Sequence, residues 1–428
     1  MITAAVCGCG SRGLFAYSTY ARLHPDRLKI VAGADIRPER LQMLREMYGV
    51  PEEMCFSSDD EMLSVPKLSD AMIISTQDRR HVYDAMKALD LGYDLILEKP
   101  MSPELSDILA LQKKAHETGR TVVVCHVLRY TPFYSAMKEI LDAGEIGRVV
   151  TIDATENVGY YHFAHSFVRG NWRRVDETSP MILAKCCHDM DYLRWLAGSP
   201  CVSLSSYGGL SVFRKEAAVP GAGTRCTADC PEEVRARCPY DAEKIYITGS
   251  RGFQKNGDSW PQNVVVSEPT EEKLEKALKE GPYGRCVYAC DNDVYDHQTV
   301  LMQFENGIEA TFTTSAFSEA IYRTIKITGT EGELYGNLEK NRITVKRFGE
   351  EVKNVDLSVK KGEFEGHGGG DAGLAEDFIR VLSGEKEALT SIDASVDSHV
   401  MALAAQASAE NGGERILLSD FVHKAVRE

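Results

Sequence analysis

The feature that most constrains the fold is a run of glycines close to the start of the chain. Gly8, Gly10 and Gly13 form G-x-G-x-x-G directly after the apolar run "ITAAVC". In this pattern the first glycine permits a tight turn, the second lets the backbone approach a diphosphate, and the third allows a helix to pack on the strand. The loop, which includes Ser11 and Arg12, therefore predicts a strand, a phosphate-binding turn and a helix N-terminus.

Apolar runs and helical patterns alternate through the first third of the chain. Strands are expected at "ITAAVC", "LKIVAGAD", "AMIIST", "YDLILEKP" and "TVVVCHV", with helices near 12–23, 37–48, 79–91 and 103–118. This alternation is typical of βαβ units and predicts a doubly wound parallel sheet, a Rossmann domain over residues 1–126.

Asp35 lies at the end of the second expected strand, 22 residues after Gly13. A carboxylate there hydrogen-bonds ribose hydroxyls and repels a 2′-phosphate, which favours NAD over NADP. Arg37 leaves NADP open, because an arginine at this place can bind that phosphate. A glycine-rich turn without a nucleotide is the structural alternative.

Composition excludes some classes of partner. The net charge of −15 argues against nucleic acid, and no apolar run is long enough to span a bilayer. "MITAAVCGCGSRG" has no basic segment or long apolar segment of a signal peptide, so a cytoplasmic location and reduced cysteines are expected.

Two motifs further along the chain, taken together with the glycine loop, resemble those of a known family. Glu98-Lys99-Pro100 ends the fifth expected strand, and "NWRRVDETSPMILAKCCHDMDYLRWLAG" carries Trp172, Arg173, His188 and Asp191. Together with the glycine loop, these motifs resemble the Gfo/Idh/MocA family of sugar and inositol oxidoreductases. The resemblance implies a second α+β domain, residues 127–428, with a large open, mostly antiparallel sheet, and an active site between the domains.

The resemblance also implies roles for particular residues. Thr76, Gln77, His81 and Glu98 would lie near the cofactor, Lys99 near the nicotinamide and the substrate hydroxyl, and His188 would transfer a proton. A solvent-exposed lysine and a surface histidine are the structural alternatives. Many members have an aspartate four residues before the histidine, where this chain has Ala184. Lys185 follows, and we hypothesise that it tunes His188 or binds substrate.

The segment from Leu183 to Gly198 reads as one helix. Ile182, Cys186, Met190, Leu193 and Ala197 form an apolar stripe, so Cys186 is expected in the core. Lys185, His188 and Tyr192 are expected on the opposite face, toward the cleft. A Cys187–His188 nucleophile pair is disfavoured, because adjacent helical residues point about 100° apart.

Beyond residue 150 short amphipathic strands predominate, and Asn306-Gly307 predicts a hairpin. The threonine-rich "EATFTTSAF" suits a sheet that faces another subunit, so a homodimer or homotetramer is expected. C-terminal helices are expected near 371–412.

An insert near 211–298 concentrates cysteines. Cys226, Cys230 and Cys238, completed by Cys286 or Cys290, predict a structural zinc site, with Cys290 the preferred fourth ligand. Packed free thiols and a disulfide are the alternatives.

Substrate contacts are expected from an aromatic and basic segment and a glycine-rich loop, because rings suit a sugar and arginine suits a carboxylate or phosphate. The candidates are Tyr160, His165, Arg169, Trp172, Arg173 and His367.

Three functions remain open. The first is an NAD-dependent oxidoreductase acting on a ring hydroxyl of a sugar, sugar derivative or cyclic polyol. The second is a glycosidase that oxidises the ring C3 position transiently before elimination. The third is a non-catalytic NAD-binding regulator, against which the Lys99 and His188 pair argues.

Overall fold

Two β-sheets organise the molecule, as a computed structural model that describes residues 1–357 and 366–427 shows. The six-stranded sheet has the order β3-β2-β1-β4-β5-β6. All of its neighbouring strands are parallel. This is the doubly wound order that the alternating pattern predicted. Its strands are β1 (Ile2–Cys7), β2 (Leu28–Ala34), β3 (Cys55–Phe56), β4 (Ala71–Ile74), β5 (Asp94–Leu97) and β6 (Val122–Val124).

Helices connect these strands over both faces. They are α1 (Thr19–Leu23), α2 (Pro38–Tyr48), α3 (Asp59–Met62), α4 (His81–Asp90) and α5 (Leu105–Thr118). The helix expected at 12–23 is divided, because the segment Ser11–Tyr17 is π-helical and precedes α1. The strand order reverses between β1 and β4, and ligands of such sheets bind at the carboxyl ends beside that point.

The second sheet has nine strands in the order β14-β13-β12-β11-β7-β10-β9-β8-β15. Only the pair β7 and β10 is parallel among its described strands, so the expected mostly antiparallel sheet is confirmed. The Asn306-Gly307 hairpin joins β9 to β10 with Gly307 at φ +83°. The strands are β7 (Val149–Asn157), β8 (Cys201–Gly209), β9 (His297–Phe304), β10 (Glu309–Ser315), β11 (Tyr322–Gly329), β12 (Gly332–Asn337), β13 (Arg342–Arg347), β14 (Lys353–Asp356) and β15 (Ile416–Leu417).

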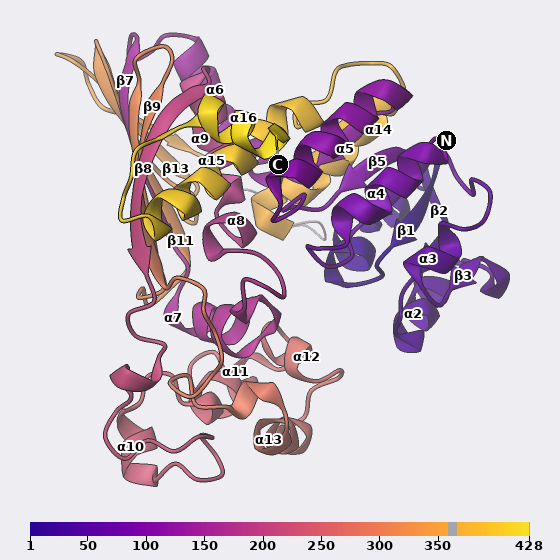
Figure 1. Cartoon of the computed structure of the whole chain (residues 1–428), viewed down its shortest axis with the longest axis vertical. Helices are drawn as coiled ribbons and strands as arrows, with labels where there is room; N and C mark the ends of the chain where they lie inside the picture. The colour runs from indigo at the N-terminus through magenta and orange to yellow at the C-terminus, as the bar shows by residue number, and fades with distance from the viewer. Residues whose placement is uncertain (358–365, 428) are drawn as a thin grey trace.

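Helices lie between this sheet and the parallel sheet (Figure 1). Strand β9 alternates exposed and buried residues along its length, which shows that the helices cover only one of its faces. The helices of this layer and of the C-terminus are α6 (Pro132–Asp142), α8 (Met181–Ala184), α9 (Cys187–Ala197), α15 (Ile392–Glu410) and α16 (Leu418–Arg427). In the described part of the chain, no helix combines the length and apolar character needed to cross a membrane.

The insert occupies residues 210–296, between β8 and β9, and projects away from both sheets (Figure 1). Its helices are short: α10 (Glu232–Arg237), α11 (Phe253–Asn256), α12 (Gln262–Val265) and α13 (Glu271–Glu280). The segment that begins with α7 (Tyr160–Phe163) packs against it, because Phe163 stacks on Phe213 with ring centroids 5.3 Å apart.

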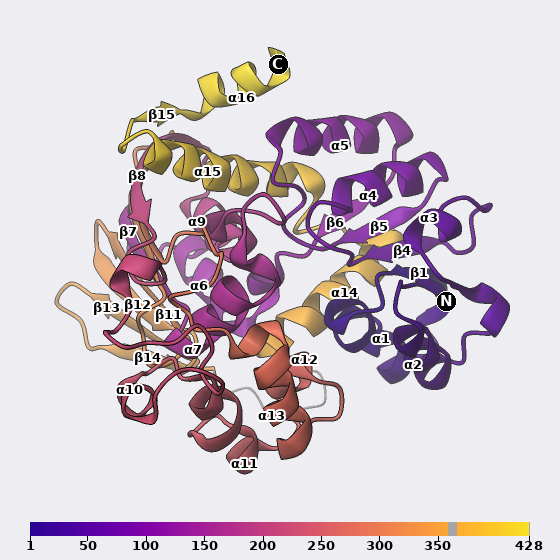
Figure 2. The same cartoon turned by 60° about the horizontal axis from the view of Figure 1, so that its bottom comes forward.

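Helix α14 (Gly370–Leu382), in the C-terminal part of the chain, packs against the Rossmann domain. Leu374, Phe378 and Ile379 are buried in the same core as Val6 and Leu14. Figure 2 shows α14 running beside α1. Residues more than 350 positions apart therefore build the wall next to the glycine loop.

Candidate functional site

Of the three glycines in the loop, only Gly10 has room for a Cβ atom. A Cβ on Gly8 would lie 2.5 Å from the Ser75 carbonyl oxygen, and one on Gly13 would lie 2.2 Å from the Gly8 oxygen. A Cβ on Gly10 would meet nothing within 4 Å. The loop is therefore packed from behind at Gly8 and Gly13 and open in front of Gly10, as a bound diphosphate requires.

Asp35 follows the carboxyl end of β2, next to this loop. Its Oδ1 accepts hydrogen bonds from the Arg37 backbone N–H at 2.9 Å and from Arg37 Nε at 3.4 Å. The side chain of the intervening Ile36 is exposed. The Arg37 guanidinium is thus held beside a carboxylate, which already supplies its negative partner.

Arg12 does not project from the loop as a free phosphate ligand. Its Nε donates to Glu98 Oε1 at 2.6 Å, and its terminal nitrogens donate to both Asp371 oxygens at 2.7 and 3.0 Å. Tyr17 Oη bonds to both Arg12 and Glu98. Burial alone would raise the pKa of Glu98, but Arg12 and then Lys99 outweigh it and lower that pKa to about 2.

The loop after β4 carries Thr76, Gln77 and His81. Thr76 Oγ1 donates to Asp84 Oδ2 at 2.8 Å, and burial raises the pKa of Asp84 to about 7. His81 Nδ1 lies 2.7 Å from the Pro100 oxygen and its Nε2 lies 3.1 Å from the Thr76 oxygen. The His81 ring therefore lies between the Thr76 carbonyl of its own loop and the Pro100 carbonyl after β5, and only Nδ1 reaches the segment after β5. Gln77 is exposed in the same loop.

Lys99 and His188 come from different domains and lie close enough for the charge of Lys99 to act on His188. Lys99 follows β5, and its Nζ donates to the Ala184 oxygen at 3.0 Å, at the end of α8. His188 lies in the first turn of α9 and is buried, and its Nδ1 has no hydrogen-bond partner within residues 1–357 and 366–427. Burial and then the charge of Lys99 lower the pKa of His188 well below its usual value. The imidazole is therefore neutral at pH 7 and can accept a proton.

Two further histidines face His188. Its ring centroid lies 5.9 Å from that of His126 and 6.2 Å from that of His367. His126 follows β6 and is fully buried, with its pKa lowered by burial. The sequence interpretation missed His126, although its place directly after a parallel strand matches that of Lys99. Asp371 holds His367 Nδ1 at 3.2 Å.

Lys185 does not point at His188 as its hypothesised tuning role requires. Its Nζ lies 3.3 Å from Glu156 Oε1, and its charge instead lowers the pKa of His162, after burial. Arg323 Nε is 2.9 Å from both Glu156 and Asp189. These four residues form a buried ion cluster, and Lys99 is the lysine that acts most on His188.

The expected single helix is broken at Lys185 and Cys186, between α8 and α9. Cys186 is buried, which confirms its core position, but Tyr192 is fully buried too. Tyr192 stacks on Tyr134 with centroids 4.3 Å apart, so that face is packed and is not a cleft wall. Asp191 binds Arg129 in a bidentate pair at 2.6 and 2.7 Å.

Trp172 and Arg173 lie on the segment that crosses to the Rossmann domain. Trp172 Nε1 donates to Asp78 Oδ1 at 3.4 Å, and Ser179 Oγ donates to Asp78 Oδ2 at 2.7 Å. Asp78 is buried and was not singled out from the sequence, where a loop aspartate carries no distinguishing signal. Arg173 pairs with Asp291 at 2.9 Å on the insert.

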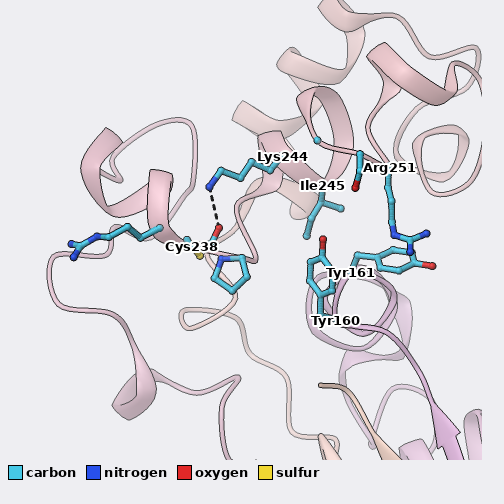
Figure 3. Close-up of a pocket in the computed structure, with 10 residues that line it drawn as sticks. Tyr160, Tyr161, Cys238, Lys244, Ile245 and Arg251 are labelled. Carbon is cyan, nitrogen blue, oxygen red and sulfur yellow. Dashed lines mark hydrogen bonds between the residues drawn. The ribbon is translucent and has the colours of Figure 1, made fainter. Parts of the chain in front are cut away.

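His165 and Arg169 are buried against the insert and do not reach the cleft side of the segment. His165 stacks on Tyr283 at 4.7 Å and hydrogen-bonds Tyr246, and burial lowers its pKa to about 3. Arg169 donates to the carbonyl oxygens of Arg285 and Tyr240, each at 2.8 Å. Tyr160 lines a separate pocket of the insert (Figure 3).

The predicted zinc site is not supported. Among residues 1–357 and 366–427, no three histidine, cysteine, aspartate or glutamate side chains are arranged to hold a metal ion. Cys226 instead accepts a hydrogen bond from Arg169, and Cys290 donates to the Cys286 carbonyl. All twelve cysteines, Cys230 and Cys238 included, are free thiols. The spacing brought these residues into one region without orienting their sulfurs toward a common point.

Comparison with known families accounts for nearly the whole chain. Residues 2–126 match the model of the oxidoreductase family's NAD-binding Rossmann fold. Residues 138–417 match the model of that family's C-terminal α/β domain. The chain belongs to the Gfo/Idh/MocA oxidoreductase family. The match confirms the resemblance inferred from the glycine loop and the two later motifs.

Curated relatives of this Gfo/Idh/MocA protein include two from Bacillus subtilis (strain 168). YteT, whose name assigns it only to the oxidoreductases, is 28% identical over 399 residues, covering 87% of each chain. A scyllo-inositol 2-dehydrogenase (NAD(+)) is 27% identical over 208 residues, 48% of this chain and 57% of the relative. The chain thus spans most of YteT and little more than half of the inositol enzyme.

Solved structures of the same architecture cover almost all of the Gfo/Idh/MocA chain. An oxidoreductase from Agrobacterium radiobacter in complex with NAD+, L-tartaric acid and magnesium has a TM-score of 0.68 at 16% identity, covering 98% and 99% of the two chains. The WlbA dehydrogenase of Bordetella pertussis, in complex with NADH and UDP-GlcNAcA, has a TM-score of 0.65 at 19% identity, covering 97% of each. At these identities the likeness shows a shared fold.

Proposed function

We propose that this protein is an NAD-dependent dehydrogenase that oxidises or forms a ring hydroxyl of a sugar, sugar derivative or cyclic polyol. The observation that carries this proposal is that the charge of Lys99 acts on His188, a neutral imidazole whose Nδ1 has no hydrogen-bond partner among the described residues. Lys99 follows the carboxyl end of β5, and the glycine loop follows the carboxyl end of β1. His188 lies at the same edge of the parallel sheet, with its ring 5.9 Å from that of His126, which follows β6. That edge is where cofactor and substrate meet in doubly wound folds.

The loop from Gly8 to Gly13 would hold the diphosphate of NAD, and Asp35 its adenosine ribose. The open space at Gly10 and the clash-prone positions of Gly8 and Gly13 fit this assignment. Bound NAD supplies the hydride acceptor. The hydrogen bonds between Arg37 and Asp35 favour NAD over NADP. The arginine that would bind a 2′-phosphate is already paired with the Asp35 carboxylate.

His188 takes the hydroxyl proton and Lys99 holds the hydroxyl oxygen. A general base must be deprotonated at the working pH, and the lowered pKa of His188 meets that condition. The Lys99 ammonium donates a hydrogen bond to the oxygen as negative charge develops on it. His367, Trp172 and Tyr160 are proposed to face the substrate, whereas His165, Arg169 and Arg173 hold the insert in place. Lys185 is proposed to position His162 through its charge.

The direct test is purified protein with NAD and a panel of cyclic polyols, aldoses and glycosides, with NADH formation followed by absorbance. We expect at least one polyol or sugar to yield NADH in amounts equal to product. His188→Gln should abolish this while leaving NADH binding intact. Binding of NADH without turnover of any panel member would favour the non-catalytic regulator.

A second candidate is the redox-neutral cleavage of a glycoside with transient oxidation at C3. The arrangement of His367 on Asp371, with its ring 6.2 Å from that of His188, favours it by offering a second proton-transfer group. Elimination needs one group to remove a ring proton and another to protonate the departing oxygen. Aglycone release without net NADH in the same panel would identify this reaction.

The uncovered face of the nine-stranded sheet is proposed to form a subunit interface. Threonine pairs line it, such as Thr155 with Thr324 at 2.7 Å. Leu301 and Tyr207 are exposed on the same face, by 55% and 67%. Large apolar side chains on a flat, ladder-like surface are typical of association surfaces.

A further inference from the structure

A second histidine, His126, is buried next to His188. Its ring meets that of His188 edge on, with the ring centroids 5.9 Å apart and the ring planes at 80°. It also meets the ring of His399 on α15, at 5.5 Å and 66°. His126 has no exposed surface, whereas His188 keeps 6%. His126 can therefore act on a bound substrate only through a neighbouring side chain such as His188.

Ser398 determines which nitrogen of His126 carries the ring hydrogen. Ser398 Oγ lies 3.3 Å from His126 Nε2 and donates its single hydrogen to the Ser395 carbonyl oxygen at 2.7 Å. The hydroxyl oxygen can then only accept from the ring. Asp191 Oδ1, 3.9 Å from the same nitrogen, also favours a hydrogen there. Burial lowers the pKa of His126, so the neutral ring has a bare Nδ1 that can only accept a hydrogen bond.

The Nδ1 atoms of His126 and His188 are both left without a partner. Each is buried, and neither has a hydrogen bond to any residue in the described part of the chain. Native proteins leave few buried polar atoms unpaired, because an unpaired atom costs free energy. Rings 5.9 Å apart hold their nitrogens too far from each other for a direct hydrogen bond. One water between them would pair both atoms, and two polar partners are enough to hold a buried water.

His188 can serve as a base only through its Nε2. Because Nδ1 is buried, Nε2 is the ring nitrogen that can reach the cleft. In a neutral imidazole, the hydrogen bond made by one nitrogen sets which of the two carries the hydrogen. An acceptor next to Nδ1 keeps the hydrogen there and leaves the lone pair of Nε2 free. With the hydrogen on Nε2 instead, the ring would donate to a substrate hydroxyl and could not take its proton.

We propose that His126 is a positioning residue for His188. Through one water, the bare Nδ1 of His126 accepts a hydrogen bond from the Nδ1–H of His188 and so keeps Nε2 of His188 free to act as the base. The hydroxyl proton then goes to Nε2 as the hydride leaves for the nicotinamide, and no proton passes through His126. The catalytic consequence rests on the proposed function, whereas the position of the hydrogen on His188 can be measured without any substrate.

NMR of the full-length protein, labelled with 15N on histidine only, measures this position directly. The signals of His188 are identified by their loss in His188→Gln. We expect His188 to carry its hydrogen on Nδ1 and His126 to carry its hydrogen on Nε2. A His188 ring with its hydrogen on Nε2 in the parent protein would overturn the proposal. Because no substrate is present, this result stands whether or not any sugar or polyol is oxidised.

Two variants of similar size separate the loss of an acceptor from a change in packing. His126→Asn keeps an oxygen near the place of Nδ1, and His126→Leu has no acceptor. In His126→Leu the hydrogen of His188 should move toward Nε2, and kcat with a sugar or polyol that the parent oxidises should fall about ten- to a hundredfold. KM and NADH affinity should stay as in the parent, because the bond matters only in the reacting step. His126→Asn should recover most of the lost kcat and the Nδ1–H form of His188.

Tyr134→Phe is the matched control, because it removes a buried hydroxyl from the ring that stacks on Tyr192 of the same helix α9 at 4.3 Å. It should change neither the His188 signals nor kcat. Equal losses of kcat in His126→Asn and His126→Leu, or a parent-like kcat in His126→Leu, would overturn the proposal. If His126→Leu does not fold, the spectrum of the parent decides alone. A parent protein that shows the expected His188 signals but forms no NADH would instead contradict the dehydrogenase assignment and leave the position of the hydrogen established.

Discussion

Arg12 Nη2 lies 2.7 Å from Asp371 Oδ1, which ties the glycine loop to a residue 359 positions later. The same guanidinium holds Glu98, the residue before Lys99, at 2.6 Å. One cation thus joins three segments that border the proposed cofactor site. The backbone N–H of Lys99 in turn donates to Glu98 Oε2 at 2.8 Å. The contact between Arg12 and Glu98 therefore also fixes the position of the Lys99 backbone.

Arg12→Met should destabilise the fold by about 3–5 kcal/mol, because Glu98 and Asp371 are left buried without their cation. Urea unfolding measures this loss. The matched control is Arg27→Met, which breaks the pair of Arg27 with Glu376 on the same helix α14; these two side chains are 32% and 40% exposed. That change should cost less than about 1 kcal/mol, and equal losses in the two variants would contradict the role given to Arg12.

Acid should remove the stabilisation from this contact. The pKa of Glu98 is about 2 in the folded protein, against the usual 4.5 of a glutamate. A lowered folded pKa stabilises the fold above about pH 4.5, and the contribution disappears as the pH falls toward 2. Unfolding free energies of the parent and Arg12→Met should therefore draw together as the pH falls from about 5 toward about 2. A constant difference across that range would show that Glu98 is not the titrating partner.

Lys99→Met should lower kcat by about 10²–10⁴-fold and move the acidic limb of the kcat/KM profile to higher pH. The Lys99 charge lowers the pKa of His188, so its removal lets the imidazole protonate at higher pH. Lys185→Met serves as the comparison, because its ammonium pairs with Glu156. A larger shift in Lys185→Met than in Lys99→Met would restore the tuning role first inferred for Lys185.

Gly10→Ala and Gly13→Ala should separate cofactor binding from folding. A methyl at Gly10 meets open space, so unfolding should change by less than about 0.5 kcal/mol while NADH binds at least about tenfold more weakly. A methyl at Gly13 meets the Gly8 oxygen at 2.2 Å and should destabilise the fold itself. NADH fluorescence titration and thermal unfolding measure the two effects. Normal NADH affinity in Gly10→Ala would remove the loop from the cofactor site.

Leu301→Lys should dissociate the proposed oligomer, because it places a charge on the uncovered sheet face. Light scattering after size-exclusion chromatography measures the mass directly. Val264→Lys, on α12 and 49% exposed, is the control and should leave the mass unchanged. A monomeric parent protein would rule out the interface altogether.

Local rules account for what could be predicted from the sequence. The glycine loop was recognisable because the limit on φ acts within a single residue, and Gly8 has φ +90°. The Ser75 carbonyl that leaves no room for a Cβ at Gly8 is, in contrast, a contact between distant segments. The strands were recognisable because fully buried parallel strands are continuously apolar, as "AMII" is in β4. Lys99 and His188 were identified from motifs, without knowledge of their geometry.

The partners of the side chains depended on contacts between segments that are distant in the chain. Nothing near Arg12 in the chain indicates Asp371 as its partner, and His126 has no motif of its own. Arg169 looked suited to a substrate anion, yet packing buried it against carbonyl oxygens of the insert. The partner of a buried charge depends on which segments the fold brings together. The sequence by itself thus determined the elements and the reactive side chains, and only the tertiary structure decided which of them meet.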